Sequence, residues 1–161
     1  MRGLVATVGR MDPQRWRVQF ELQAPREQLR VPPPAAVQRR DGLWRHLCGE
    51  LFVASEGERY AEFNFAPSGD WAAYLFDGWR RHSRPAVLEF APQVGLLEAS
   101  AQCLSWAAEF TLPPTLGAPV RIAPCAVVEM AGGELCYWAV AHGAAQPDFH
   151  REESFVPWVN E

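Results

Sequence analysis

Hydrophobic and polar residues alternate in short runs along most of this chain, which is the pattern of half-buried β-strands. In residues 15–23, RWRVQFELQ, every second position from Trp16 to Leu22 is large and apolar. A period of two places these side chains on one face of a sheet. No segment combines a helical period with capping residues. Eight further strands are predicted at residues 47–54, 60–66, 71–79, 86–90, 96–106, 109–112, 120–130 and 135–141.

Turn-forming residues separate these runs and favour an all-β fold. The chain has 14 Pro and 12 Gly among 161 residues, and 48% of its residues are hydrophobic. Three successive prolines in residues 30–41 predict an extended connection, and Pro67-Ser68-Gly69 predicts a turn. We therefore expect one domain over residues 1–161, folded as an antiparallel β-sandwich or jelly roll.

The second and third predicted strands form a hairpin whose register is constrained by parity. Leu51 and Val53 must face the core together with Phe63 and Phe65. A slip of one residue would turn every side chain of a strand to the opposite face. Paired residues must therefore have an even index sum, which disfavours a four-residue loop.

Two registers of this hairpin remain, and charge separates them. One sets Glu50 opposite Glu62, whereas the other sets Glu50 opposite Asn64 with a five-residue loop at residues 55–59. Like charges directly opposite each other destabilise a sheet. We therefore predict the pair Glu50–Asn64, with Glu62 diagonal to it. The face away from the core then presents His46, Cys48, Glu50, Phe52, Tyr60, Glu62 and Asn64.

Charge and composition exclude several functions. All 15 basic residues are Arg, so lysine Schiff-base chemistry and the lysine-bearing phosphate loop are absent. The net charge is −4, with nine Arg and four acids in the first 45 residues. No basic stripe interleaved with aromatic residues follows, so no nucleic-acid partner is predicted.

The chain also lacks the signals of export and membrane insertion. The N-terminus has no continuous apolar segment, and no apolar run is long enough to span a membrane. The cysteines Cys48, Cys103, Cys125 and Cys136 form no C-x-x-C pair, so no structural zinc site is predicted. We expect a cytoplasmic protein with free thiols and no membrane contact.

Three motifs resemble those of the bacterial DOMON-like proteins, which are related to the family 9 carbohydrate-binding modules. They are DGLWRHxCxELF at residue 41, YxEFNFAPSGxWAAYxFDG at residue 60, and YWAVAH with QPDFH near the end. The resemblance covers most of the chain and is most specific from Asp41 to Arg80. It implies a jelly-roll β-sandwich that binds a ligand on a concave face without catalysis.

In such sugar-binding modules two aromatic rings clamp a terminal sugar, and acids and amides bind its hydroxyl groups. The resemblance assigns the run W-x-x-x-x-x-E to Trp44 and Glu50, which share a face because they are six residues apart on a strand. Either Trp138 or Phe149 would supply the second ring.

The chain departs from the family pattern at two positions. Gly49 replaces an aromatic residue before the Glu, which predicts a gap in the core. Gln146 replaces a Lys before Pro-Asp-Phe-His, which removes a cationic contact to the ligand.

The predicted function is binding of a saccharide or another small polar ligand by Trp44, Glu50, Glu62 and Asn64. The competing interpretation is structural: Asn64 bonds a turn, Glu62 pairs with an arginine, and the domain is an interaction scaffold with an unused pocket. Two neighbouring carboxylates also admit a glycosidase, although no enzyme is predicted. Trp16, Trp106 and Trp158 are assigned to packing.

Two further clusters have open interpretations. His46, Cys48 and Glu50 have the chemistry of a metal site, but a half-buried histidine beside an inert thiol is favoured. Met11 and Met130 are poorly placed for haem, so no cofactor is predicted. Near the end, His142 and the segment Gln146–His150, with Asp148, Phe149 and His150, either border the pocket or form a turn that Asp148 closes.

Overall fold

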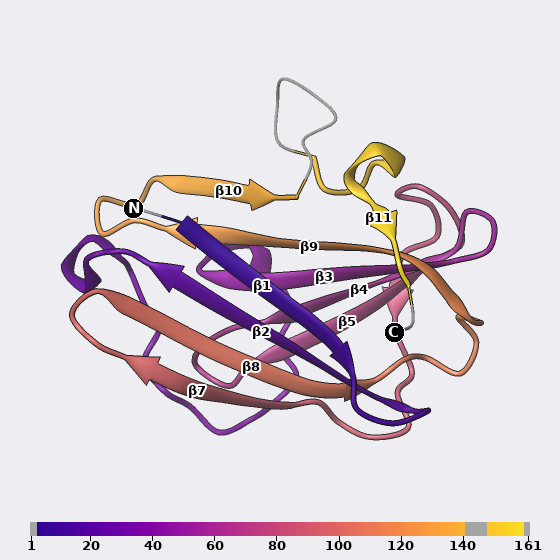
Figure 1. The fold of residues 1–161 in the computed structure, drawn as a ribbon, viewed down its shortest axis with the longest axis horizontal. Coiled ribbons are helices and arrows are strands. Elements are labelled where there is room, and N and C mark those ends of the chain that lie inside the picture. Colours follow the sequence, from indigo (N-terminus) through magenta and orange to yellow (C-terminus); the bar gives the residue numbers. More distant parts are fainter. Residues whose placement is uncertain (1–2, 141–147, 160–161) are drawn as a thin grey trace.

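Two antiparallel β-sheets form the protein, as the computed structural model of residues 3–140 and 148–159 shows (Figure 1). The smaller sheet has the order β1 (Gly3–Arg10), β2 (Arg15–Gln23), β8 (Cys103–Thr111) and β7 (Gln93–Ala99). The larger has the order β10 (Leu135–Ala139), β9 (Pro119–Glu129), β3 (Cys48–Ser55), β4 (Tyr60–Phe65), β5 (Trp71–Phe76) and β6 (Arg84–Pro85), and β11 (Val156–Pro157) extends it along β9. The predicted all-β sandwich is confirmed.

Helical structure is confined to short 3₁₀ turns in the described residues. They are η1 (Arg26–Gln28), η2 (Leu43–Arg45) and η3 (Glu152–Ser154). None of the described helices has the length and apolar character that a membrane crossing requires.

The strand predictions are correct along most of the larger sheet and wrong around β7 and β8. A turn at Ser100, closed by its N–H and the carbonyl of Cys103 at 2.9 Å, divides the predicted run 96–106. Past this turn, β8 continues without interruption to Thr111, so the predicted strand 109–112 is its end. Residues 86–90 form no strand, because only Ala86 bonds to β5 before the chain leaves the sheet. The unpredicted strand β1 alternates weakly and is half-buried.

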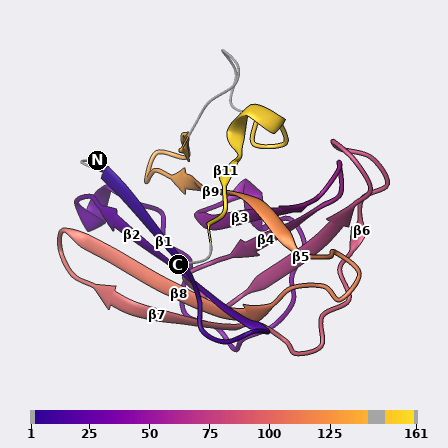
Figure 2. The ribbon, with the colours of Figure 1, turned by 45° about the vertical axis from the view of Figure 1, so that its right-hand side comes forward.

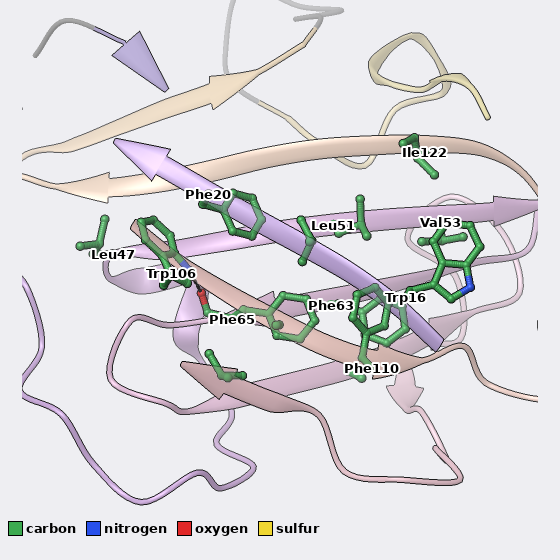
Figure 3. Packing of buried hydrophobic residues seen from close by; sticks show 14 of the residues in the cluster. Trp16, Phe20, Leu47, Leu51, Val53, Phe63, Phe65, Trp106, Phe110 and Ile122 are labelled. Carbon is green, nitrogen blue, oxygen red and sulfur yellow. Dashed lines mark hydrogen bonds between the residues drawn. The ribbon is translucent and has the colours of Figure 1, made fainter. Parts of the chain in front are cut away.

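The core lies between the sheets and is rich in aromatic rings (Figure 3). Phe20 of β2 stacks on Trp106 of β8 with ring centroids 5.3 Å apart. The indole N–H of Trp106 donates across the sandwich to the carbonyl of Phe65, at 2.9 Å. Trp16 is buried against Trp158, with centroids 4.8 Å apart. The packing predicted for these three tryptophans is therefore confirmed.

The predicted hairpin register is also confirmed. Glu50 pairs with Asn64, and Leu51 pairs with Phe63. The loop between β3 and β4 is closed by the N–H of Ser55 and the carbonyl of Arg59, at 3.2 Å. Parity and charge together were sufficient here because the two strands are adjacent in sequence and one face of each packs in the core between the sheets.

The predicted core gap at Gly49 is absent, because Phe20 fills the space. A Cβ atom built on Gly49 would lie 2.5 Å from Cδ2 and Cε2 of the Phe20 ring, which is fully buried. The two positions compensate: the smallest residue on β3 faces a large one on β2.

Gly49→Ala is therefore expected to lower the free energy of unfolding by about 1–3 kcal/mol, the usual cost of overpacking a core. Chemical denaturation measures the change. Gly95→Ala is the matched control on β7, because nothing lies within 4 Å of a Cβ built there. An unaltered stability in Gly49→Ala would contradict the close contact with Phe20.

The outer face of the larger sheet is the one turned away from the smaller sheet, and it carries a second cluster of side chains. Phe52, Tyr60 and Phe76 project here, because each alternates with core residues on its strand. The C-terminal segment that carries β11 passes over this face (Figure 2) and adds Phe149 and Phe155. The outer face is therefore partly covered, and the space left uncovered is a cavity.

Candidate functional site

The cavity over the outer face of the larger sheet has a volume of about 440 Å³, within the range of small-molecule sites. Its lining comes from β3, β4, β5, β9 and β10, the loop after β5, the η2 turn and the C-terminal segment. The lining residues are Trp44, Glu50, Glu62, Tyr74, Phe76, Arg80, Ser83, Val127, Tyr137, Asp148, Phe149 and His150.

Two buried carboxyl groups form the polar floor of the cavity. Glu50 and Glu62 are 3% and 5% exposed. Burial raises the pKa of both carboxyl groups, and the negative charge of Glu62 raises the pKa of Glu50 further. Oε1 of Glu50 has no hydrogen-bond partner among the described residues, and its Oε2 has only the Cys125 thiol at 4.0 Å. The floor therefore has unused hydrogen-bonding capacity.

Asn64 holds Glu62 and does not line the cavity. Its Nδ2 donates to Oε1 of Glu62 at 2.7 Å, and the amide is fully buried. This hydrogen bond acts against the effect of burial on the pKa of Glu62. Asn64 therefore bonds a neighbouring acid and not a turn, and its predicted contact with a ligand becomes an indirect one.

A chain of hydrogen bonds reaches the floor from the loop after β5. The backbone N–H of Arg80 donates to the hydroxyl of Tyr60 at 3.1 Å, and this hydroxyl lies 2.8 Å from Nδ1 of His150. Burial raises the pKa of Tyr60 to about 12 and lowers that of His150 to about 4. Tyr60 is thus the donor to a neutral imidazole, whose Nε2 lies 3.5 Å from Oε2 of Glu62.

Asp148 closes a turn and borders the cavity, so the two alternatives weighed from the sequence are compatible. Its Oδ1 accepts from the backbone N–H of His150 at 3.1 Å and from the Arg80 guanidinium at 2.6 Å. The backbone of Arg80 has φ +55°, a conformation that residues other than glycine rarely adopt. The ion pair and the bond to Tyr60 fix this arginine at the rim.

Trp44 reaches the cavity from the η2 turn, so the prediction that it shares a strand with Glu50 is wrong. Its ring is 40% exposed and meets Tyr74 of β5 edge to face, with centroids 5.9 Å apart. The turn is anchored by buried Leu43 and begins after Gly42, whose φ is +81°. Strand alternation therefore does not explain why Trp44 and Glu50 meet at one site.

The aromatic ring that β10 contributes to the cavity is that of Tyr137 and not that of Trp138. Alternation along β10 turns Trp138 toward the core between the sheets, whereas Tyr137, 40% exposed, faces the cavity. Tyr137 meets Phe149 with ring centroids 6.1 Å apart. The predicted alternative, Phe149, does line the cavity.

Sequence reasoning missed several lining residues for three different reasons. Tyr74 is paired with Glu62 across β4 and β5, so extending the hairpin register by one strand would have found it. Tyr137 is placed through β9, whose pairing with β3 joins segments about 70 residues apart and leaves no local signal. Arg80 and Ser83 lie in the loop after β5, where no periodicity applies.

The side chains of His46, Cys48 and Glu50, which have the chemistry of a metal site, do not converge in the structure. His46 lies before β3, and its Nδ1 is 2.8 Å from Oε2 of Glu129 rather than beside Glu50. Within residues 3–140 and 148–159, no three His, Cys, Asp or Glu side chains converge as metal ligands. The predictions on His142 and Gln146 concern residues outside the described ranges.

Comparison with known proteins supports the fold. No family model matches this chain, and no curated protein matches it either. Among solved structures, it is similar to a crystal structure described as a putative carbohydrate-binding protein from Bacteroides uniformis. The TM-score is 0.64 at 13% sequence identity, over 94% of this chain and 75% of the other. At that identity the likeness concerns the β-sandwich alone.

Proposed function

We propose that this chain binds a saccharide in the cavity above Glu50 and Glu62 and does not transform it. The observation that carries the proposal is Glu50, a residue that lines the cavity and whose carboxyl group has one buried oxygen without a partner among the described residues. Buried polar atoms are otherwise almost always hydrogen-bonded, so such an atom at a cavity suggests a ligand that donates to it. Sugar hydroxyl groups are donors of this kind.

The walls of the cavity suit the other surface of a sugar. Trp44, Tyr137 and Phe149 present aromatic rings around the polar floor. Such rings cover the C–H faces of a pyranose, while fixed carboxylates bind its hydroxyl edges. The resemblance to DOMON-like proteins and the carbohydrate-binding description of the structural neighbour both favour this ligand class.

Saccharide binding is expected to be detected by calorimetry against a panel of mono- and disaccharides, with modest affinity because ordering offsets much of the contact energy. Trp44→Ala should weaken that binding about tenfold, through loss of one stacking ring. Calorimetry is preferred to fluorescence because Trp44 would itself be the reporter. Phe90→Ala is the control, since Phe90 is exposed and does not line the cavity. If no sugar of the panel gave a binding signal in calorimetry, the interaction-scaffold interpretation would be favoured.

The neighbouring acids make glycoside hydrolysis the alternative to exclude. Burial raises the pKa of both acids of the floor. A raised pKa by itself does not distinguish an acid catalyst from a binding group. We expect no release of the chromophore from aryl glycosides. Turnover that disappears in Glu50→Gln would overturn the non-catalytic assignment.

A further inference from the structure

Among the described residues, the two acids of the cavity floor make no ion pair with an arginine, although the charge of Arg80 acts on Glu62 from a distance. Arg80 is the arginine that lines the cavity, and its guanidinium is bound to Asp148 at 2.6 Å. A buried carboxylate without a counter-ion is strongly disfavoured, so each acid is protonated or awaits a cation.

His150 does not supply the missing positive charge. Its Nδ1 lies 2.8 Å from the Tyr60 hydroxyl, which already receives the N–H of Arg80. A proton on Nδ1 would leave the hydroxyl hydrogen of Tyr60 without an acceptor in this arrangement. His150 is therefore a neutral donor toward Glu62, 3.5 Å from Nε2 to Oε2.

The rings around this acidic floor add a second preference for a cation. Trp44 and Tyr74 meet edge to face on one side, and Tyr137 and Phe149 meet on another. The faces of such rings attract ammonium groups, most strongly where water is excluded. Arg39 and Arg45 of this chain already lie over the Tyr74 and Trp44 rings, at 5.6 Å and 5.9 Å from the ring centroids. The preference for a cation on the ligand therefore rests on Tyr137 and Phe149. Acidic floor and aromatic walls thus favour the same kind of group on the ligand.

We infer that the preferred ligand is an amino sugar, whose protonated amine binds between the carboxylates of Glu50 and Glu62 while its ring contacts the aromatic walls. This inference rests on the proposed saccharide binding and specifies its substrate class. A neutral sugar would supply hydroxyl donors but leave the charge of an ionised floor uncompensated. An anionic sugar would meet two acids directly, which makes uronic acids the least favoured class.

Calorimetry with matched sugars tests the inference. Glucosamine, galactosamine and mannosamine are compared with their parent hexoses and their N-acetyl derivatives, which keep the ring but remove the charge. At least one amine is expected to bind tenfold or more tightly than both of its neutral counterparts. Glu62→Gln should reduce that preference to less than threefold. Glu89→Gln removes an exposed charge that does not line this cavity and should leave the preference intact.

Each contrary result has a separate meaning. Parent hexoses that bind as tightly as the amines would overturn the inference and support the proposed saccharide binding. No binding by any member of the panel would overturn both. Binding of tetramethylammonium at the affinity of the amino sugars would show that the ring is irrelevant, and would also overturn the assignment to an amino sugar.

Discussion

Trp106→Ala is expected to lower the free energy of unfolding by about 3–5 kcal/mol, the usual cost of removing a large buried aromatic ring. Trp106 is fully buried between the sheets and stacks on Phe20 at 5.3 Å. Its indole N–H also satisfies the carbonyl of Phe65, so the alanine variant leaves both a cavity and an unpaired acceptor. Urea denaturation followed by circular dichroism gives the change.

Trp106→Phe is the companion variant because it keeps a ring against Phe20 and removes the N–H donor. Its expected loss is about 1–3 kcal/mol, the desolvation penalty of one unsatisfied buried group together with the reduced ring area. If Trp106→Ala cost less than about 1 kcal/mol, well below the range for such truncations, the indole would not be a central contact between the sheets.

Glu50→Gln is expected to weaken saccharide binding about 10–100-fold, because a hydrogen bond to a charged group contributes about 1.5–3 kcal/mol. The same change should stabilise the unliganded protein at mildly alkaline pH by about 1–3 kcal/mol, since a buried carboxylate without a partner is unfavourable. A residue whose removal improves stability and impairs binding is typical of a functional site.

The pH dependence of that stabilisation follows from the raised pKa of Glu50. The pKa of the Glu50 carboxyl group is higher in the folded protein than in the unfolded chain. At a pH below the unfolded-state pKa, this group contributes its full stabilisation to the folded protein. That stabilisation is lost as the pH rises through the folded-state pKa. The advantage of Glu50→Gln over the parent should therefore grow with pH. His150 has the opposite trend, because its pKa falls from 6.5 to about 4, so its contribution grows as the pH rises between those values.

Urea denaturation of both proteins over a range of pH measures the effect of Glu50 together with its interaction with Glu62, because His150 is present in each. Glu129→Gln is the control: that acid is equally buried but has Arg30 and His46 as partners, so its removal should destabilise the protein. A difference between Glu50→Gln and the parent that is independent of pH would contradict the raised pKa of Glu50.

The residues of the β3–β4 hairpin show how far the sequence reaches. The need to bury Leu51 and Phe63 together fixes parity, and repulsion between Glu50 and Glu62 selects the remaining register. Both arguments use strands that are adjacent in the chain and joined by a short loop. The pairing could therefore be predicted without knowledge of the rest of the fold.

The aromatic walls of the site show where that reasoning stops. Trp44 was assigned to the site by motif spacing, but it reaches the cavity from a 3₁₀ turn that packs on β5. The resemblance offers Trp138 or Phe149 as the second ring; Phe149 lines the cavity, whereas the pairing of β10 with β9 turns Tyr137 to it in place of Trp138. β9 itself is placed by its pairing with β3, about 70 residues away, so no local pattern tells which of the two rings faces the cavity.

The sequence by itself determined the all-β class, most strand positions, the β3–β4 register and the placing of Glu50, Glu62 and Asn64 on the face turned away from the core. These depend on a period of two and on charges close in the chain, which are local properties. Only the tertiary structure decided that β3 pairs with β9, that Phe20 fills the space beside Gly49, and that Arg80, Tyr60 and His150 bond in series above Glu62. Such contacts join segments from about 20 to 90 residues apart, so side-chain packing and hydrogen-bond geometry select them and no short-range pattern records them.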